Sequence, residues 1–266
     1  MYSKTIRSVS FAKAWEEAVK FVRKSPEKLT FGGGKEVKHA VDSQCTIILD
    51  EYAVRDVLNH VVHPSDPFAT PLKLKEYIAE YTDEYDASRF DYTYYNILKR
   101  GFYVTNANTP KESWFNQIEA LRKGLKKQCD ENLSSNRNVA TLWNPVVHTY
   151  SLKATPCWNE ISIRWKCKGQ VQIFWTFRSH DLFSAWGGNT VAMTEFLNRE
   201  VVKPCNCEIV EIIENNYSLH IYDYDLPKAN EIKTVQINPA LQRLQNKYDR
   251  IDHPTIFDEF LESKGL

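Results

Sequence analysis

The sequence of 266 residues lacks any apolar run near the ~20 residues that a membrane-spanning helix needs. Basic and acidic side chains balance at 34 each, so no overall field draws the chain toward nucleic acid or a membrane surface. With only 9 glycines and 11 prolines, the composition is not that of a disordered chain. The N-terminus has no apolar segment typical of a signal peptide. We therefore expect a packed, cytoplasmic protein that binds no membrane and whose overall charge does not favour nucleic acid.

Metal-binding patterns are also scarce among the 6 cysteines. Cys205 and Cys207 form a Cys-x-Cys pair, but no second pair and no suitably spaced histidines accompany it. Closed zinc sites need four ligands, so we expect no metal site. Scattered cysteines that stay reduced fit the cytoplasmic location.

Hydrophobic periodicity predicts one α+β domain over residues 1–266, because no linker or internal repeat divides the chain. The last stretch, Ile237–Leu266, mixes helix and strand signals. Helices are predicted over Phe11–Arg23, Pro71–Tyr85, Lys111–Gln128 and Thr190–Val202, and strands over Cys45–Leu49, Asn138–Trp143, Cys207–Glu214 and Tyr217–Tyr224.

Two stretches in which apolar and polar residues alternate flank the pair Lys168-Gly169, which predicts a β-hairpin. An antiparallel hairpin brings its open ends together. Cys157 precedes the first strand, so it would lie opposite the residues that follow the second. A thiol would then meet a cation, a hydroxyl and a carboxylate: Arg178, Ser179 and Asp181.

Five segments, in this order, resemble the thymidylate synthase family: FDYTYYN, NRNVATLWNP, TPCWNEI, FRSHDLFSAWGGNTVAM and LHIYDYD. The segment HPSDPFATPLKLKEYIAEY, which precedes them, resembles the compact archaeal-type branch of the family. The resemblance covers roughly Pro64–Tyr224, and five motifs in order are more specific than any one of them. It implies a mixed or antiparallel sheet with helices packed on one side.

The resemblance also implies an activity: transfer of a one-carbon unit from 5,10-methylenetetrahydrofolate, or a related reduced pterin, to C5 of a pyrimidine nucleoside monophosphate. Conversion of dUMP to dTMP is the first interpretation. Cys157 resembles the nucleophile that adds to C6, and the charge of Arg178 would favour its thiolate. Two alternatives stay open: a hydroxymethylase acting on dUMP, dCMP or CMP by the same chemistry, and a non-catalytic relative that binds nucleotide or RNA.

Phosphate binding is implied for three residues. Arg178 and Ser179 resemble the pair that holds the 5′-phosphate. Arg137 resembles the arginine that the partner subunit donates, which implies a homodimer with shared active sites. The usual Arg-Arg pair reads Asn136-Arg137 here, so one cation is missing. The N-terminal phosphate ligand is expected to be one of two lysines, Lys35 or Lys38.

Base and sugar recognition are implied for three more residues. Asn189 resembles the amide that reads the pyrimidine, since an amide can donate to O4 and accept from N3–H. An alternative is that Asn189 caps the helix beginning at Thr190. His220 and Tyr222 alternate on a strand, so both would face the sugar.

The remaining assignments concern the cofactor and proton transfer. Asp181 resembles the carboxylate that binds the pterin, and Tyr94 resembles a tyrosine of the catalytic site. Glu76 is the expected general acid or base, although the same predicted helix carries two other glutamates, Glu80 and Glu84. His180 replaces a cysteine of the family motif and has no expected role.

Overall fold

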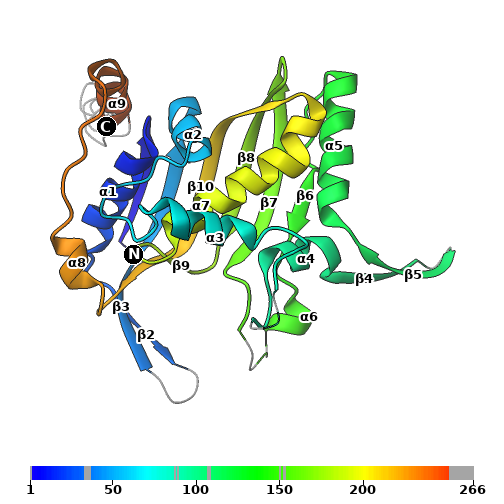
Figure 1. Cartoon of the computed structure of the whole chain (residues 1–266), viewed down its shortest axis with the longest axis horizontal. Helices are drawn as coiled ribbons and strands as arrows, with labels where there is room; N and C mark the ends of the chain where they lie inside the picture. The colour runs from blue at the N-terminus through cyan, green and yellow to red at the C-terminus, as the bar shows by residue number, and fades with distance from the viewer. Residues whose placement is uncertain are drawn as a thin grey trace, which may run out of the picture.

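The structure is a computed structural model that describes residues 2–32, 37–86, 88, 90–106, 109–149, 151 and 154–251. Lys35 and the end of the stretch Ile237–Leu266, beyond residue 251, lie outside the described residues. The helices and strands follow one another as β1 (Ser3–Ser8), α1 (Phe11–Val22), β2 (Lys28–Gly32), β3 (Val37–Leu49), α2 (Glu51–Leu58), α3 (Pro71–Ala79), α4 (Tyr94–Arg100), β4 (Phe102–Asn106), β5 (Thr109–Phe115), α5 (Gln117–Glu131), β6 (Val139–Thr141), α6 (Pro145–His148), β7 (Trp158–Cys167), β8 (Gln170–Phe177), β9 (His180–Asp181), α7 (Trp186–Leu197), β10 (Glu208–Tyr222), α8 (Leu226–Asn230) and α9 (Pro239–Ile251) (Figure 1).

A mixed sheet organises these elements, with strand order β1-β3-β10-β8-β7-β6. The long strand β10 lies at its centre, antiparallel to β3 and parallel to β8. The short strand β9 also pairs with β10, and β2 pairs with β3. The helices α1, α2, α3 and α7 lie on one side of the sheet (Figure 1). The predicted α+β class, with helices packed on one side of a mixed sheet, is confirmed.

The predicted hairpin is β7 and β8, which pair antiparallel. Lys168 and Gly169 have φ values of 49° and 78°. Two positive φ values in a two-residue loop match the twist of the paired strands, and glycine adopts this conformation without steric cost. Trp158 pairs with Phe177, so the two open ends of the hairpin meet.

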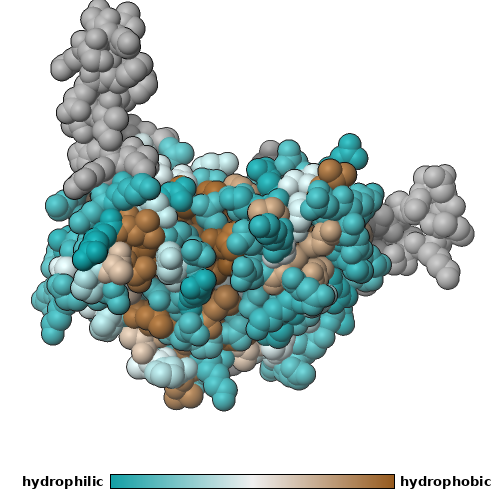
Figure 2. All heavy atoms as spheres, turned by 90° about the horizontal axis from the view of Figure 1, so that it is seen from above, coloured by the Kyte–Doolittle hydropathy of each residue, from teal (hydrophilic) through white to brown (hydrophobic). Residues whose placement is uncertain are grey.

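Alternation along the strands separates two faces of the sheet. In β7, Ile161, Ile163 and Trp165 are buried beneath the helices, and Trp175 follows the same rule in β8. The buried hydrophobic residues form one cluster that extends along the chain from Ile6 to Ala229. The surface seen from above is mainly hydrophilic, with apolar side chains gathered near its middle (Figure 2). The division of the chain into a single domain stays a prediction.

Helix α7 packs unusually close to the loop that precedes α3. A Cβ atom on Gly187 would lie 2.1 Å from Oδ2 of Asp66, and one on Gly188 would lie 2.7 Å from Cε1 of Phe68. Both glycines therefore allow an approach that no other residue permits. This approach sets α3 against α7, which brings together side chains from both helices.

Several predicted boundaries were wrong, for local reasons. Residues Lys111–Phe115 belong to β5, and the helix begins only at Gln117, where the Asn116 side chain accepts from Glu119 N. The two strands predicted in Cys207–Tyr224 are one strand, β10, whose register shifts between Asn216 and Leu219. The helix predicted from Thr190 begins at Trp186, and that predicted to reach Tyr85 ends at Ala79.

In the part of the chain that the structure describes, no helix is long and apolar enough to span a membrane. A π-helical turn, Asn198–Val202, and a 3-10 turn, Lys203–Cys205, extend α7 toward the start of β10.

Substitution Gly187→Ala should lower the free energy of unfolding by about 1–3 kcal/mol, because the new methyl group overlaps the Asp66 carboxylate. Urea denaturation measures the change. The same substitution in an Asp66→Ala background, where the whole carboxyl group is gone, should cost much less. Equal costs in the two backgrounds would contradict this account of the close approach.

Candidate functional site

Arg178 follows β8 at the open end of the β7–β8 hairpin, the hairpin mouth, next to the loop that carries Cys157. Its backbone N donates to Cys157 O at 3.0 Å. Its guanidinium donates from Nε to Pro156 O at 2.9 Å and from Nη2 to the carbonyl and hydroxyl oxygens of Thr155 at 3.1 and 2.9 Å. The guanidinium also lies 5.1 Å from the ring centre of Trp143. Arg178 thus holds the loop that presents Cys157, as the hairpin prediction requires.

The Cys157 thiol is half-buried and has charged neighbours of both signs. Burial raises its pKa above the ordinary value, the charge of Arg178 lowers it, and that of Asp181 raises it again. Burial has the larger effect, so the net shift is upward. Arg178 lowers the pKa of the thiol, as expected, but this effect is smaller than that of burial, so the pKa stays above its ordinary value.

Three tyrosine side chains lie near the thiol. Burial is the main cause of a raised pKa at Tyr77, Tyr92 and Tyr94, and the charge of Cys157 contributes to each of these shifts. The Tyr92 hydroxyl donates to Thr155 O at 3.0 Å, in the loop that Arg178 holds. These tyrosines border a cavity of about 280 Å³. Its lining residues are Tyr77, Glu80, Tyr81, Phe90, Asp91, Tyr92, Thr93, Tyr94 and Ala154.

Asn189 is 4% exposed and lies in the first turn of α7, which has Ala185 at its N-cap position. Its Oδ1 accepts from the Tyr77 hydroxyl at 2.6 Å, and its Nδ2 lies 3.0 Å from Nε2 of His180. The side chain therefore does not cap the helix, and that alternative is wrong. Asn189 and Tyr77 meet because α7 and α3 pack closely.

Behind Asn189 lies a buried polar cluster centred on Glu214, which is 1% exposed. Burial raises the pKa of this carboxyl, but hydrogen bonds with His180, Asn216 and Trp175 outweigh burial and lower it. Trp175 Nε1 and Trp186 Nε1 each donate to Glu214 at 2.7 Å. An ionised carboxylate in the core requires such partners.

His220 and Tyr222 share one face of β10, as predicted, with ring centres 4.9 Å apart. His220 is 2% exposed, and neither ring nitrogen makes a well-formed hydrogen bond with the described residues. Burial lowers the pKa of His220 to about 4. Phe31 covers the imidazole at 4.8 Å, and Lys38 lies 5.6 Å from the ring centre of Tyr222.

Asp181 lies at the end of β9, and its Oδ1 accepts from the backbone N of Phe183 and of Ser184 at 3.1 and 2.9 Å. Burial raises the pKa of this carboxyl, and the charge of Asp225 adds to the shift. Ser179 is half-buried between Arg178 and β9. These residues lie together at the hairpin mouth, as the sequence predicted.

Two predicted residues lie apart from this group. Glu76 is exposed on α3, whereas Glu80, the residue directly after that helix, lines the cavity together with Tyr77. Arg137 is exposed before β6. Because Val139 pairs with Ser162, Arg137 lies toward the far end of β7 from Cys157.

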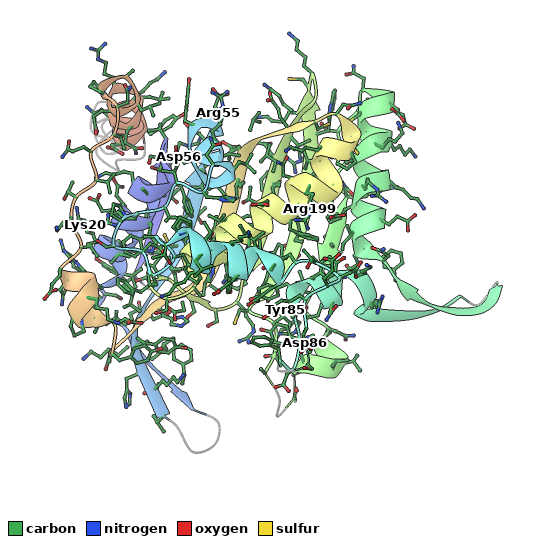
Figure 3. All side chains as sticks on the ribbon, viewed as in Figure 1. Lys20, Arg55, Asp56, Tyr85, Asp86 and Arg199 are labelled. Atoms are coloured by element: carbon green, nitrogen blue, oxygen red, sulfur yellow. The ribbon has the colours of Figure 1, made fainter. Side chains whose placement is uncertain are left out.

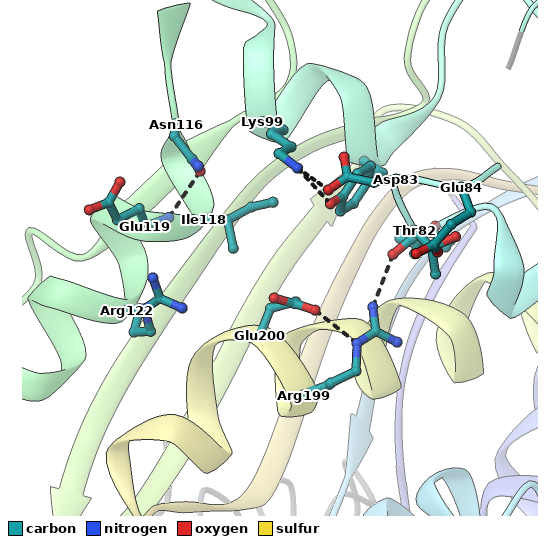
Figure 4. A pocket seen from close by; sticks show the side chains of 12 residues that line it. Thr82, Asp83, Glu84, Lys99, Asn116, Ile118, Glu119, Arg122, Arg199 and Glu200 are labelled. Carbon is teal, nitrogen blue, oxygen red and sulfur yellow. Dashed lines mark hydrogen bonds and ion pairs between the residues drawn. The ribbon is translucent and has the colours of Figure 1, made fainter. Parts of the chain in front are cut away.

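A second cavity, of about 360 Å³, lies away from Cys157, and most of its charges are paired. Lys99 donates to Asp83, and Arg199 donates to Glu200 at 2.8 Å (Figure 4). Arg199 also donates to Tyr81 O at 3.0 Å, beside the segment that follows α3 (Figure 3). Glu84 lines this second cavity and not the one lined by Tyr77, Tyr92 and Tyr94.

Within the described residues, no group of three or more histidine, cysteine, aspartate or glutamate side chains is arranged to hold a metal ion. Cys207 Sγ lies 3.2 Å from Cys129 Sγ, and Cys205 Sγ donates to Arg122 O.

The family model described as thymidylate synthase matches residues 73–261 of this chain. The chain belongs to the thymidylate synthase family. It is 28% identical to proteins named "Putative thymidylate synthase" from Methanothermobacter marburgensis, over 64% of this chain and 67% of that protein, and from Methanothermobacter thermautotrophicus, over 67% and 72%. The predicted resemblance is confirmed.

The fold comparison agrees with this membership. The crystal structure of thymidylate synthase from T4 phage superposes with a TM-score of 0.59 at 14% identity, covering 84% of this chain and 81% of that chain. At this identity the match shows the thymidylate synthase fold alone.

Three residues of this thymidylate synthase family member were not predicted from the sequence: Tyr77, Tyr92 and Glu214. His180 was assigned no role. One signal was available for Glu214. It shares its strand face with Ile212 and Asn216, because alternate residues of a strand face one way, and an acidic residue on a buried face needs partners.

Acidification should destabilise the protein through His220. Its pKa is about 4 when folded and ~6.5 when unfolded, so stability is complete above pH 6.5 and is lost as the pH falls toward 4. Between pH 7 and 5 this loss is about 2 kcal/mol. Denaturant unfolding at both pH values should show a fall in the wild type that exceeds the fall in His220→Gln by this amount. Parallel pH profiles would contradict the assignment.

Proposed function

We propose that the protein transfers a one-carbon unit from 5,10-methylenetetrahydrofolate to C5 of dUMP, forming dTMP, through a covalent bond between Cys157 and C6. The observation that carries the proposal is the meeting of Cys157, Arg178 and Asp181 at the hairpin mouth of a thymidylate synthase family member. The same family membership supports the broader assignment to methyltransferases of nucleotide biosynthesis.

Cys157 acts as the nucleophile. Its sulfur forms a bond to C6, and the C5–C6 electron pair moves toward O4, which makes C5 nucleophilic. The raised pKa of the thiol means that addition depends on removal of its proton, which the charge of Arg178 favours. Arg178 uses Nε and Nη2 to hold the loop, so Nη1 can meet a phosphate oxygen together with Ser179.

The ring nitrogens of buried His220 support a role in binding the sugar, because their contact with the Ser218 backbone does not meet the geometry of a full hydrogen bond. A buried polar group without a partner costs free energy, and a sugar hydroxyl could both donate to and accept from the imidazole. Tyr222 shares this face of the strand. Lys38 lies beside Tyr222 and is the one of the two expected lysines, Lys35 and Lys38, that the structure describes, so we assign it to the phosphate.

The folate would supply the electrophilic carbon and, in methylation, the hydride. Asp181 fits its pterin, because Oδ1 is held by two backbone N–H groups and Oδ2 remains able to accept N–H donors. Tyr94 lines the cavity of about 280 Å³, and the charge of Cys157 contributes to its raised pKa.

We assign proton transfer to Glu80 in place of Glu76. Glu80 is half-buried, and burial raises the pKa of its carboxyl. It lines the same cavity as Tyr77 and Tyr94. A carboxyl whose pKa is raised toward neutrality is suited to give and take protons during turnover.

Substitution Cys157→Ser should abolish formation of dTMP while dUMP binding survives, because a serine hydroxyl at its high pKa adds to C6 far more slowly. Product analysis by mass spectrometry after incubation with dUMP and methylenetetrahydrofolate measures turnover and separates methylation from hydroxymethylation. Cys167→Ser, an exposed cysteine at the other end of β7, is the matched control and should stay active. Turnover of Cys157→Ser within tenfold of the wild type would exclude Cys157 as the nucleophile.

A homodimer with shared sites is also part of the proposal. Opposite the face that the helices cover, one row of cross-strand neighbours carries half-exposed apolar side chains, among them Ile48, Ile213 and Phe174. A second subunit packed on this face would bury them. Arg137, exposed and distant from Cys157 along β7, would then serve the partner's site.

Mixing two inactive variants tests this arrangement. Mixed dimers of Cys157→Ser with Arg137→Ala contain one site that carries neither lesion, so random subunit exchange should restore about a quarter of wild-type activity. Activity assays before and after exchange measure the recovery. A monomer in sedimentation, or no recovery after verified exchange, would refute the shared site.

A further inference from the structure

The amide of Asn189 is held from two sides within the buried site. The Tyr77 hydroxyl donates to Oδ1 at 2.6 Å, and Nδ2 lies 3.0 Å from Nε2 of His180. Asn189 is 4% exposed and His180 is 2% exposed, so water does not readily replace either contact. One N–H and one lone pair of the amide remain for a ligand.

Which of these remaining groups meets which base atom depends on the orientation of the amide. A rotation of 180° exchanges oxygen and nitrogen. Uracil presents an acceptor at O4 and a donor at N3, whereas cytosine presents a donor at its amino group and an acceptor at N3. An amide held in one orientation can therefore satisfy only one of the two bases.

The groups behind His180 determine its tautomer. Asn216 donates from Nδ2 to Glu214 Oε1 at 2.8 Å, so its Oδ1 faces Nδ1 of His180 at 3.2 Å. Glu214 Oε1 lies 3.4 Å from the same nitrogen. Both neighbours are acceptors, so Nδ1 carries a proton. In the form of the ring that carries this one proton, Nε2 offers a lone pair, which requires the N–H of Asn189.

Glu214 is itself fixed by the indole N–H groups of Trp175 and Trp186, each at 2.7 Å. These hydrogen bonds keep the carboxylate ionised and unable to donate. The ring of His180 also stacks on Phe177, with centres 3.8 Å apart. The imidazole ring therefore cannot rotate freely, and no neighbour among the described residues donates a hydrogen bond to Nδ1.

We infer that His180 is a positioning residue that locks the Asn189 amide in one orientation and thereby sets the choice between uracil and cytosine nucleotides. Tyr77 supports the lock from the other side. The inference rests on the proposed function, since it assumes that Asn189 reads the pyrimidine.

His180→Gln is the test, because a glutamine side chain can present either its oxygen or its nitrogen to Asn189 and so releases the lock. The ratio of kcat/KM for dUMP to that for dCMP should fall roughly 5- to 150-fold. A merely structural defect would weaken both nucleotides alike and leave the ratio unchanged. His60→Gln, an exposed histidine paired with Glu195 and remote from this network, is the matched control and should keep the wild-type ratio.

Tyr77→Phe provides a second variant, with no loss of ring volume, should His180→Gln fail to fold. It removes the hydrogen bond to Oδ1, so the ratio should fall in the same direction. If the folded variants keep the wild-type ratio within twofold, the lock is overturned while the proposed function stands.

The wild type separates the two proposals. A preference for dCMP that His180→Gln relaxes would overturn the assignment to dUMP and support the lock. Binding of neither nucleotide, measured by calorimetry, would overturn both.

Discussion

The buried carboxylate of Glu214 is the constraint on which the arrangement of this site depends. A charge in a core is tolerated only when hydrogen bonds replace its lost hydration, and removal of one partner of a buried pair costs about 3–5 kcal/mol. Here the partners come from different elements: Trp175 from β8, Trp186 from α7, His180 from β9 and Asn216 from β10 itself. Satisfying one carboxylate therefore fixes how the central strand, the hairpin and the central helix meet.

The second constraint is the hairpin, whose ends lie together because its strands pair antiparallel. Arg178 follows one strand and donates to the loop before the other, so the residue that supplies positive charge also positions the thiol. The charge of Arg178 alone does not produce a thiolate, since burial raises the pKa of Cys157 more than Arg178 lowers it. The structure thus holds a shielded thiol close to tyrosine side chains, with its pKa above the ordinary value.

Sequence reasoning succeeded where a local pattern decides the outcome. Alternation predicted β7 and β8, and helical spacing predicted α1 to within one residue at its end. It failed where tertiary contacts override the pattern. The helical spacing of Trp114 with later residues was accidental, because that residue pairs in β5. The choice between Glu76 and Glu80 stays a prediction: Glu80 lines the cavity and Glu76 is exposed, a difference that a sequence does not state. The roles of the site residues stay predictions.

The sequence by itself determined that Cys157 and Arg178 would meet, since a tight turn at Lys168-Gly169 leaves the paired strands no other arrangement. It also determined the family, through motifs that keep their order. Only the tertiary structure decided how Asn189 is oriented. Its partner Tyr77 lies 112 positions away in the chain, and the tautomer of His180 depends on Glu214 and Asn216 on another strand. Local patterns carry no information about such contacts, because hydrogen-bond partners between distant elements exist only after the elements have packed.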